Sequence, residues 1–306
     1  MNNRFSLARA VRKLFQPKLD RARATRVQRE FDSTRGYGAY HAYCQSRFTR
    51  RIDCADSALT RMGFQYVDVI DEDSARKLLE QTTASVPLAY VKKDTKNLEG
   101  YPIRDPARVE AVLRAAIPAA VDALAAGFFQ SEYLVHWFTL TRTAPAREQA
   151  SVSFRWHCDM GPSTHLKLLL YLNDSRAHGG GTAFLDLADT ARLADCGYLF
   201  GPTRQRIGDL DALARLAGRE LRPSSREFSG GQGVVFQPAR VLHTGLTPTH
   251  GPRFALTLCL LPSPVHWAEA LQRGAITDLA HEYKWHRHAA DLLAMVESET
   301  ACSTAR

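Results

Sequence analysis

Two hydrophobic periods divide the chain. Between residues 106 and 129, apolar side chains recur every three or four positions, which predicts one long helix whose apolar face packs on a sheet. Beyond residue 131 the period becomes two, which is typical of strands with one buried face. The expected strands are Tyr133–Arg142, Ser151–Asp159, Leu166–Asn173, Thr182–Leu185, Gly233–Gln237, Leu242–Thr247 and Arg253–Leu261.

These strands predict a mainly β fold with flanking helices, a double-stranded β-helix or jelly roll. Four regions are expected: a basic amphipathic arm (1–52), a mixed α/β bracing region (53–130), the jelly-roll core (131–264) and a C-terminal helical extension (265–306). The bracing region should contain a strand around Val67 and a helix capped by Asp71 or Asp73. A charged insertion, 186–226, interrupts the core. It should contain a helix over 209–219 and is a candidate lid or substrate-reading loop.

The composition indicates a globular protein: of its 306 residues, 45% are apolar and 24% are charged. No apolar run approaches the roughly 18 residues of a membrane span, so an integral membrane protein is not expected. The six cysteines form no CxxC pair, and the N-terminus has no apolar signal core. We therefore expect reduced thiols and a cytoplasmic location.

The basic charge is concentrated in the arm. Residues 1–53 contain thirteen Lys or Arg and four acidic residues, an excess that accounts for the whole net charge of +8. One interpretation is an amphipathic helix in residues 1–30 that rests on an anionic membrane, on its inner face, or docks on an acidic partner. A solvated basic helix explains the pattern equally well, and an organellar presequence is a third reading.

The first candidate for chemistry is an H-x-D pair. His157 and Asp159 stand two residues apart at the end of an expected strand, so their side chains should share a face and point to one place. Arg155 lies behind them on that face, whereas Cys158 points the other way and is expected to pack. By itself this pair is a weak signal, and a metal site requires a third ligand.

The order of segments strengthens the signal. After H-x-D come LKLLLYLND, GGGTAFL, GQGVVFQPARVLHTG and GPRFALTL. This order resembles the iron(II)/2-oxoglutarate-dependent dioxygenases, particularly the phytanoyl-CoA and prolyl-hydroxylase-like branches, over residues 133–262. The resemblance implies that His157, Asp159 and His243 bind iron(II) and form the catalytic centre. Two histidines and one carboxylate suit that ion because they leave three positions open.

The same resemblance implies cosubstrates. They are 2-oxoglutarate and O2, with ascorbate as an optional reductant; succinate and CO2 leave as coproducts while a substrate C–H bond is hydroxylated. Arg253 would anchor the far carboxylate of 2-oxoglutarate with two parallel hydrogen bonds. Ala255 stands where many members carry Ser or Thr, so a hydroxyl contact must come from elsewhere. Tyr171, Thr257 and Thr182 are the candidates.

Several side chains stay open at this level. Lys167 interrupts an apolar strand, where burial costs free energy unless the ammonium meets a negative charge. It either helps hold 2-oxoglutarate or an acidic substrate group, or it snorkels to the barrel mouth. Arg155 either reads an anionic substrate or forms a salt bridge with the insertion. His165 and His178 are expected in solvent-exposed turns.

The expected substrate is a small molecule or a lipid-linked molecule, for example an acidic sugar on a lipid. A dioxygenase acting on a protein or a nucleic acid is one alternative, and a cupin-like metal-binding module without oxygenase activity is another. No nucleic-acid partner is expected, because the positive excess lies in the arm and not around the catalytic mouth.

Overall fold

Two antiparallel sheets form the framework of the protein in a computed structural model that describes residues 37–52, 56–87, 89–90, 97–145, 152–159, 162, 164–198 and 206–273. The larger sheet has seven strands in the order β1-β7-β5-β9-β4-β3-β2, and the smaller pairs β6 with β8. The strands are β1 Phe64–Asp68, β2 Ala89–Tyr90, β3 Leu98–Tyr101, β4 Glu132–Thr143, β5 Leu166–Tyr171, β6 Gly181–Phe184, β7 Gln232–Phe236, β8 His243–Leu246 and β9 Arg253–Ser263.

Two isolated bridges extend the smaller sheet. His157 pairs with His243 at the start of β8, and Ser224 pairs with Phe184 at the end of β6. From β4 to β9 the chain thus places strands β4, β5, β7 and β9 in the large sheet and the 157 segment, β6, the 224 segment and β8 in the small one. This passage between two sheets is that of a double-stranded β-helix, and the predicted jelly roll is confirmed.

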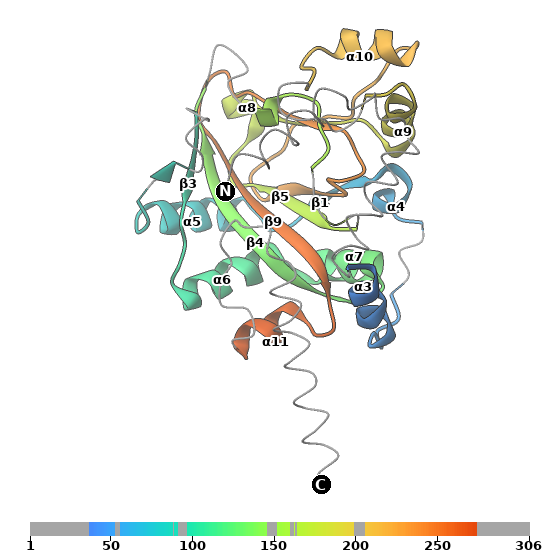
Figure 1. Ribbon diagram of the computed structural model, residues 1–306. Coiled ribbons are helices and arrows are strands. Elements are labelled where there is room, and N and C mark those ends of the chain that lie inside the picture. Colours follow the sequence, from blue (N-terminus) through green and yellow to red (C-terminus); the bar gives the residue numbers. More distant parts are fainter. Residues whose placement is uncertain are drawn as a thin grey trace, which may run out of the picture.

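Side chains of β5 alternate between the apolar core on one face of the large sheet and the interior between the two sheets on the other. Leu166, Leu168 and Leu170 are fully buried in the main apolar core. That core also contains Val112 and Val121 of the two helices beneath the sheet (Figure 1). Because side chains alternate along a strand, the remaining positions of β5 point toward the small sheet. Strand β5 therefore has one face that packs in the core and one face, with Lys167 and Tyr171, that lines the interior between the sheets.

Most helices begin where a capping residue predicts. They are α3 Tyr37–Ser46, α4 Ala58–Met62, α5 Glu72–Thr83, α6 Pro106–Ala116, α7 Ala119–Phe129, α8 Ser175–His178, α9 Leu187–Asp195, α10 Leu210–Ala217 and α11 Trp267–Gln272. The predicted cap at Asp71 is confirmed, since its side chain accepts the Ser74 N–H at 2.8 Å. Asp209 caps α10 in the same way, inside the insertion.

The single helix predicted over 106–129 is wrong. The structure has two helices, α6 and α7, that meet at an angle of 84°. Pro118 lies at the break, and proline both lacks an N–H and disfavours a helical residue before it. Across the described ranges, no helix taken singly has the length and apolarity to cross a membrane, although this bent pair taken together does by length and composition.

The strand predicted over 151–159 is also wrong. Val152–Phe154 form a short 3-10 helix, and extended pairing is limited to the bridge at His157. The backbone here bonds to three separate segments: Trp156 N–H to Ile207, His157 N–H to His243, and Asp159 N–H to Pro238. Because these partners lie in different segments, no neighbouring strand runs alongside residues 151–159, and a ladder of strand hydrogen bonds cannot form.

Helix α9 of the insertion was not predicted, although Asp186 caps it.

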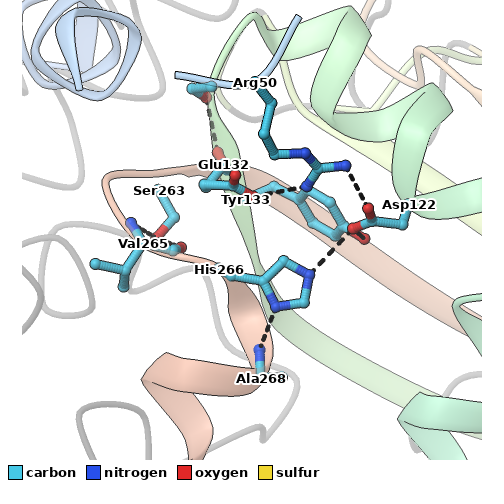
Figure 2. Close-up of polar contacts among 9 residues, drawn as sticks. Arg50, Asp122, Glu132, Tyr133, Ser263, Val265, His266 and Ala268 are labelled. Carbon is cyan, nitrogen blue, oxygen red and sulfur yellow. Dashed lines mark hydrogen bonds and ion pairs between the residues drawn. The ribbon is translucent and has the colours of Figure 1, made fainter. Parts of the chain in front are cut away.

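A cluster of polar side chains joins helix α7 to strand β4 and to His266, the residue before α11 (Figure 2). Asp122 of α7 accepts hydrogen bonds from Arg50 at 2.5 Å, from Tyr133 at 2.8 Å and from His266 at 3.1 Å. Arg50 also pairs with Glu132 at 3.0 Å. Burial would raise the pKa of Asp122, but the hydrogen bonds from His266, Arg50 and Tyr133 outweigh it and hold that pKa well below its usual range.

Replacing this carboxylate should destabilise the fold in a pH-dependent way. We expect Asp122→Asn to lower the free energy of unfolding by about 1–3 kcal/mol at pH 7, because three donors lose a charged acceptor. A depressed folded-state pKa stabilises above the unfolded pKa of about 4, so the deficit should shrink as pH falls below that value. Urea denaturation between pH 2.5 and 7 measures it. Asp56→Asn, in an exposed pair with Arg61, should change little; a deficit that stays constant with pH would contradict the account.

The predictions for residues 1–30 fall outside the described residues, as does the extension beyond residue 273. Helix α11 marks the described beginning of that extension, directly after β9.

Candidate metal centre

The structure brings the three predicted ligands together. The ligand atoms of His157, Asp159 and His243 all lie within 4.8 Å of one another. His157 Nε2 is 3.6 Å from Asp159 Oδ1, and His243 Nε2 is 3.8 Å from Asp159 Oδ2. His157 and His243 come from the two bridged segments of the small sheet, so one pair of backbone hydrogen bonds sets the spacing of the rings.

Both imidazoles are held in the orientation that a metal requires. Nδ1 of His157 lies 2.7 Å from the Arg155 carbonyl, and Nδ1 of His243 lies 3.0 Å from the Val241 carbonyl. A carbonyl can only accept, so each Nδ1 carries the proton and each Nε2 keeps its lone pair. This is the arrangement of metal-binding histidines, whose second nitrogen donates to an outer partner.

The charges of the three groups also suit a divalent ion. Burial lowers the pKa of His157 to about 3, and burial lowers the pKa of His243 as well, so both rings are neutral. Burial would raise the pKa of Asp159, but the charge and the hydrogen bond of the Lys167 ammonium oppose it, and that pKa lies well below its usual range. The site thus offers two neutral nitrogens and one carboxylate, the donor set of a facial triad.

Lys167 lies inside the centre and not at the barrel mouth. Its Nζ is 2.5 Å from Oδ2 of Asp159, and its side chain is only 14% exposed. The ammonium also lies over the ring of Trp137, 5.2 Å from the ring centroid. The negative charge that an interior lysine needs is therefore the carboxylate of Asp159, one of the three predicted ligands. The snorkelling interpretation is wrong.

Arg253 begins β9 and reaches across to the small sheet. Its Nη1 donates to the carbonyls of Gly181 at 2.7 Å and Leu246 at 3.3 Å, and its Nη2 lies 3.4 Å from Thr143 Oγ1. Its Nε is buried and has no hydrogen-bond partner within the described ranges. None of the ion pairs found among those residues involves this guanidinium, and burial lowers its pKa. A buried donor on a cation without a carboxylate fits an anionic ligand.

The three candidate hydroxyls divide between two places. Tyr171 and Thr182 share a hydrogen bond of 2.8 Å, and Tyr171 pairs in register with Ala255, two residues from Arg253. Thr257 lies further along β9, opposite Thr139 on one side and Leu169 on the other, where it stays partly exposed. The Tyr171 and Thr182 pair therefore lies at the arginine end of the interior, and Thr257 lies in its middle.

The expectation that His165 and His178 are exposed is wrong, because both are fully buried. Nδ1 of His165 donates to the Pro162 carbonyl at 2.6 Å, and Nδ1 of His178 accepts the Gly180 N–H at 3.0 Å. A backbone group three or two residues away thus satisfies one nitrogen of each ring, which lowers the cost of burial. Local partners of this kind leave no periodic signal in the sequence.

The insertion brings a residue to the centre that the sequence did not indicate. This residue is Arg206. Two hydrogen bonds hold the insertion against Trp156: the Tyr198 hydroxyl donates to the Trp156 carbonyl at 2.7 Å, and the Trp156 N–H donates to the Ile207 carbonyl at 2.9 Å. Arg206 therefore lies beside the segment that contains His157 and Asp159, where burial lowers the pKa of its guanidinium although the charge of Asp159 opposes that shift. Arg155 is exposed and donates to the Arg206 carbonyl at 3.4 Å, so it contacts the insertion, and no ion pair within the described part of the chain involves it.

Comparison with known proteins adds little at the level of sequence. No protein-family profile matches the chain. No curated protein matches it either.

Solved structures show a weak likeness. The non-heme alpha ketoglutarate dependent epimerase SnoN from nogalamycin biosynthesis is 14% identical, with a TM-score of 0.44 over 74% of this chain and 84% of its own. EctD from S. alaskensis with 2-oxoglutarate and 5-hydroxyectoine is 17% identical, with a TM-score of 0.46 over 68% and 76%. HygX from Streptomyces hygroscopicus with nickel, 2-oxoglutarate and hygromycin B is 14% identical, with a TM-score of 0.45 over 67% and 84%.

Removing any of the three ligands should abolish metal binding. We expect His157→Ala, Asp159→Ala and His243→Ala each to weaken binding of Mn(II) or Co(II) on the order of 100-fold or more, because two donors cannot hold the ion as three do. Anaerobic calorimetric titration measures the affinity. The control is His250→Ala, which removes an exposed imidazole. Wild-type affinity in any of the three variants would exclude that residue from the site.

Proposed function

We propose that this protein is an iron(II)/2-oxoglutarate-dependent dioxygenase that hydroxylates a C–H bond of a small-molecule or lipid-linked substrate. The observation that carries the proposal is the triad of two neutral, oriented imidazoles and one carboxylate between the sheets of a jelly roll. A triad of this composition that leaves positions open is diagnostic of non-haem iron(II) oxygenases.

The donor set fits iron(II). His157 and His243 would hold the ion through Nε2, and Asp159 would hold it through a carboxylate oxygen, while backbone carbonyls keep both Nδ1 atoms protonated. Phe236 packs against the His243 ring, with 5.0 Å between the centroids, and limits its rotation. When bound, the ion would supply the activation of O2 that couples conversion of 2-oxoglutarate to succinate and CO2 with hydroxylation of the substrate.

The other end of the interior fits the far carboxylate of 2-oxoglutarate. Arg253 presents a buried Nε–H that lacks a partner among the described residues, and its remaining bonds go to neutral oxygens. Tyr171 and Thr182 would supply the hydroxyl that Ala255 lacks, because their hydrogen-bonded pair lies at the arginine end of the interior. Charge-assisted hydrogen bonds of this kind are roughly twice as strong as neutral ones. Thr257 would line the path between the arginine and the metal.

The substrate class is a further part of the proposal. The basic excess in residues 1–53 favours an acidic molecule presented at an anionic surface, for example a lipid-linked sugar acid. We propose a cytoplasmic protein that binds peripherally to the inner membrane face through residues 1–30.

Loss of Arg253 should impair the cosubstrate specifically. We expect Arg253→Ala to raise the KM for 2-oxoglutarate by about 30-fold or more in a succinate-formation assay, because a buried carboxylate loses its cation. The matched control is Arg142→Ala on the neighbouring strand, whose guanidinium pairs with Glu99 at 2.8 Å. Thermal melting checks that both variants are folded, since Arg253 also joins the two sheets. An unchanged KM in folded Arg253→Ala would remove the residue from this role.

Deleting the arm should abolish membrane binding. We expect a chain without residues 1–30 to stay in the supernatant when sedimented with vesicles rich in phosphatidylglycerol, whereas the full chain should pellet at low salt. Arg9→Gln/Arg12→Gln/Lys13→Gln tests the charge alone, and neutral phosphatidylcholine vesicles serve as the control. Equal pelleting of the full and the shortened chain would end the membrane proposal and leave the dioxygenase proposal untouched.

A further inference from the structure

The ion pair between Lys167 and Asp159 connects the two sheets at the metal centre. Lys167 is the second residue of β5 in the large sheet, whereas Asp159 follows the segment that bridges to β8. Their side chains are 14% and 16% exposed, so little water screens the charges. Trp137 lies under the ammonium and helps to fix its position.

The two oxygens of Asp159 have different surroundings. Oδ2 accepts the hydrogen bond from Lys167 at 2.5 Å and lies 3.8 Å from His243 Nε2. Oδ1 lies 3.6 Å from His157 Nε2 and receives no hydrogen bond from another described residue. Lys167 of the large sheet thus binds Oδ2, whereas Oδ1 faces His157 without a hydrogen bond from Lys167.

The difference between the two oxygens determines how many coordination positions of a metal Asp159 could occupy. A carboxylate can bind a metal through both oxygens or through one. A facial triad with three open positions requires one, because chelation by both oxygens would fill a fourth position. An ammonium bonded to Oδ2 opposes chelation, both by occupying that oxygen and by placing a positive charge near the ion.

We propose that Lys167 is a positioning residue that holds Oδ2 of Asp159, so that the carboxylate serves the metal through a single oxygen and a coordination position stays open. The nearby ammonium lowers the affinity for the metal and at the same time keeps that coordination position open. In the metal-free protein the same ammonium compensates the buried carboxylate, which would otherwise destabilise the fold. The open position matters for 2-oxoglutarate, and in this respect the inference rests on the proposed function.

The test compares Lys167→Met with the wild type. We expect the variant to bind Mn(II) and Co(II) more tightly, by about tenfold or more in anaerobic calorimetry, because a nearby positive charge is removed and the carboxylate can chelate. The visible spectrum of bound Co(II), which reports coordination number, should change. The metal-free variant should melt at a lower temperature, and metal should raise its Tm more than it raises that of the wild type. The metal-loaded variant should bind 2-oxoglutarate more weakly.

Two further variants make the outcome decisive. Lys77→Met removes an exposed lysine that pairs with Asp73 at 2.6 Å, and it should alter none of these readouts. Lys167→Gln keeps a hydrogen-bond donor but not the charge, so its metal affinity should lie between those of the wild type and Lys167→Met. It also replaces the methionine variant if that protein does not fold.

Weaker or unchanged metal affinity of the Lys167 variant, or an unchanged Co(II) spectrum, would overturn the proposal. The metal titrations need no 2-oxoglutarate, so they decide on Lys167 even if the wild type fails to bind that cosubstrate and the proposed function fails.

Discussion

The buried carboxylate of Asp159 is the constraint on which the interior of this protein depends. An anion between two sheets is tolerated only when opposite charge or hydrogen-bond donors surround it. Lys167 supplies the charge from the large sheet, and the two neutral imidazoles of the small sheet complete the surroundings. The same carboxylate therefore links the stability of the metal-free fold to the chemistry of the site.

The long strands of the large sheet connect this centre with the arginine end. On β5, Lys167 and Tyr171 are four residues apart, which is about 13 Å along a strand. Their partners on β9 are Cys259 and Ala255, and Arg253 lies two residues before Ala255. The charged side chains of Lys167 and Arg253 therefore lie toward opposite ends of the interior. Arg253 then bonds to carbonyls of the small sheet and closes that end. A ligand with an anionic group at one end and metal-binding oxygens at the other matches this layout.

Much of this could be predicted from the sequence, for reasons that particular residues make plain. The period of two predicted the strand around Lys167, because alternation of apolar and polar positions is typical of a strand with one buried face. The triad followed from the H-x-D pair together with the resemblance that implied His243. The wrong predictions concern features that one residue or one set of hydrogen bonds determines and that the hydrophobic period does not reveal. Pro118 broke a helix whose apolar period continued across it, and the alternation before His157 suggested a strand where the backbone bonds to three different segments. His165 and His178 looked exposed because the carbonyl and N–H groups that satisfy them leave no pattern in the sequence.

The central claim is that the triad holds iron(II) together with 2-oxoglutarate. Its most direct test is an anaerobic titration of the full-length protein with iron(II) and then 2-oxoglutarate, monitored in the visible region. The account predicts that a weak charge-transfer band of the iron–2-oxoglutarate chelate appears with one equivalent of each. Iron binding without any such band when 2-oxoglutarate is added in excess would contradict the account and favour a metal-binding module without oxygenase activity.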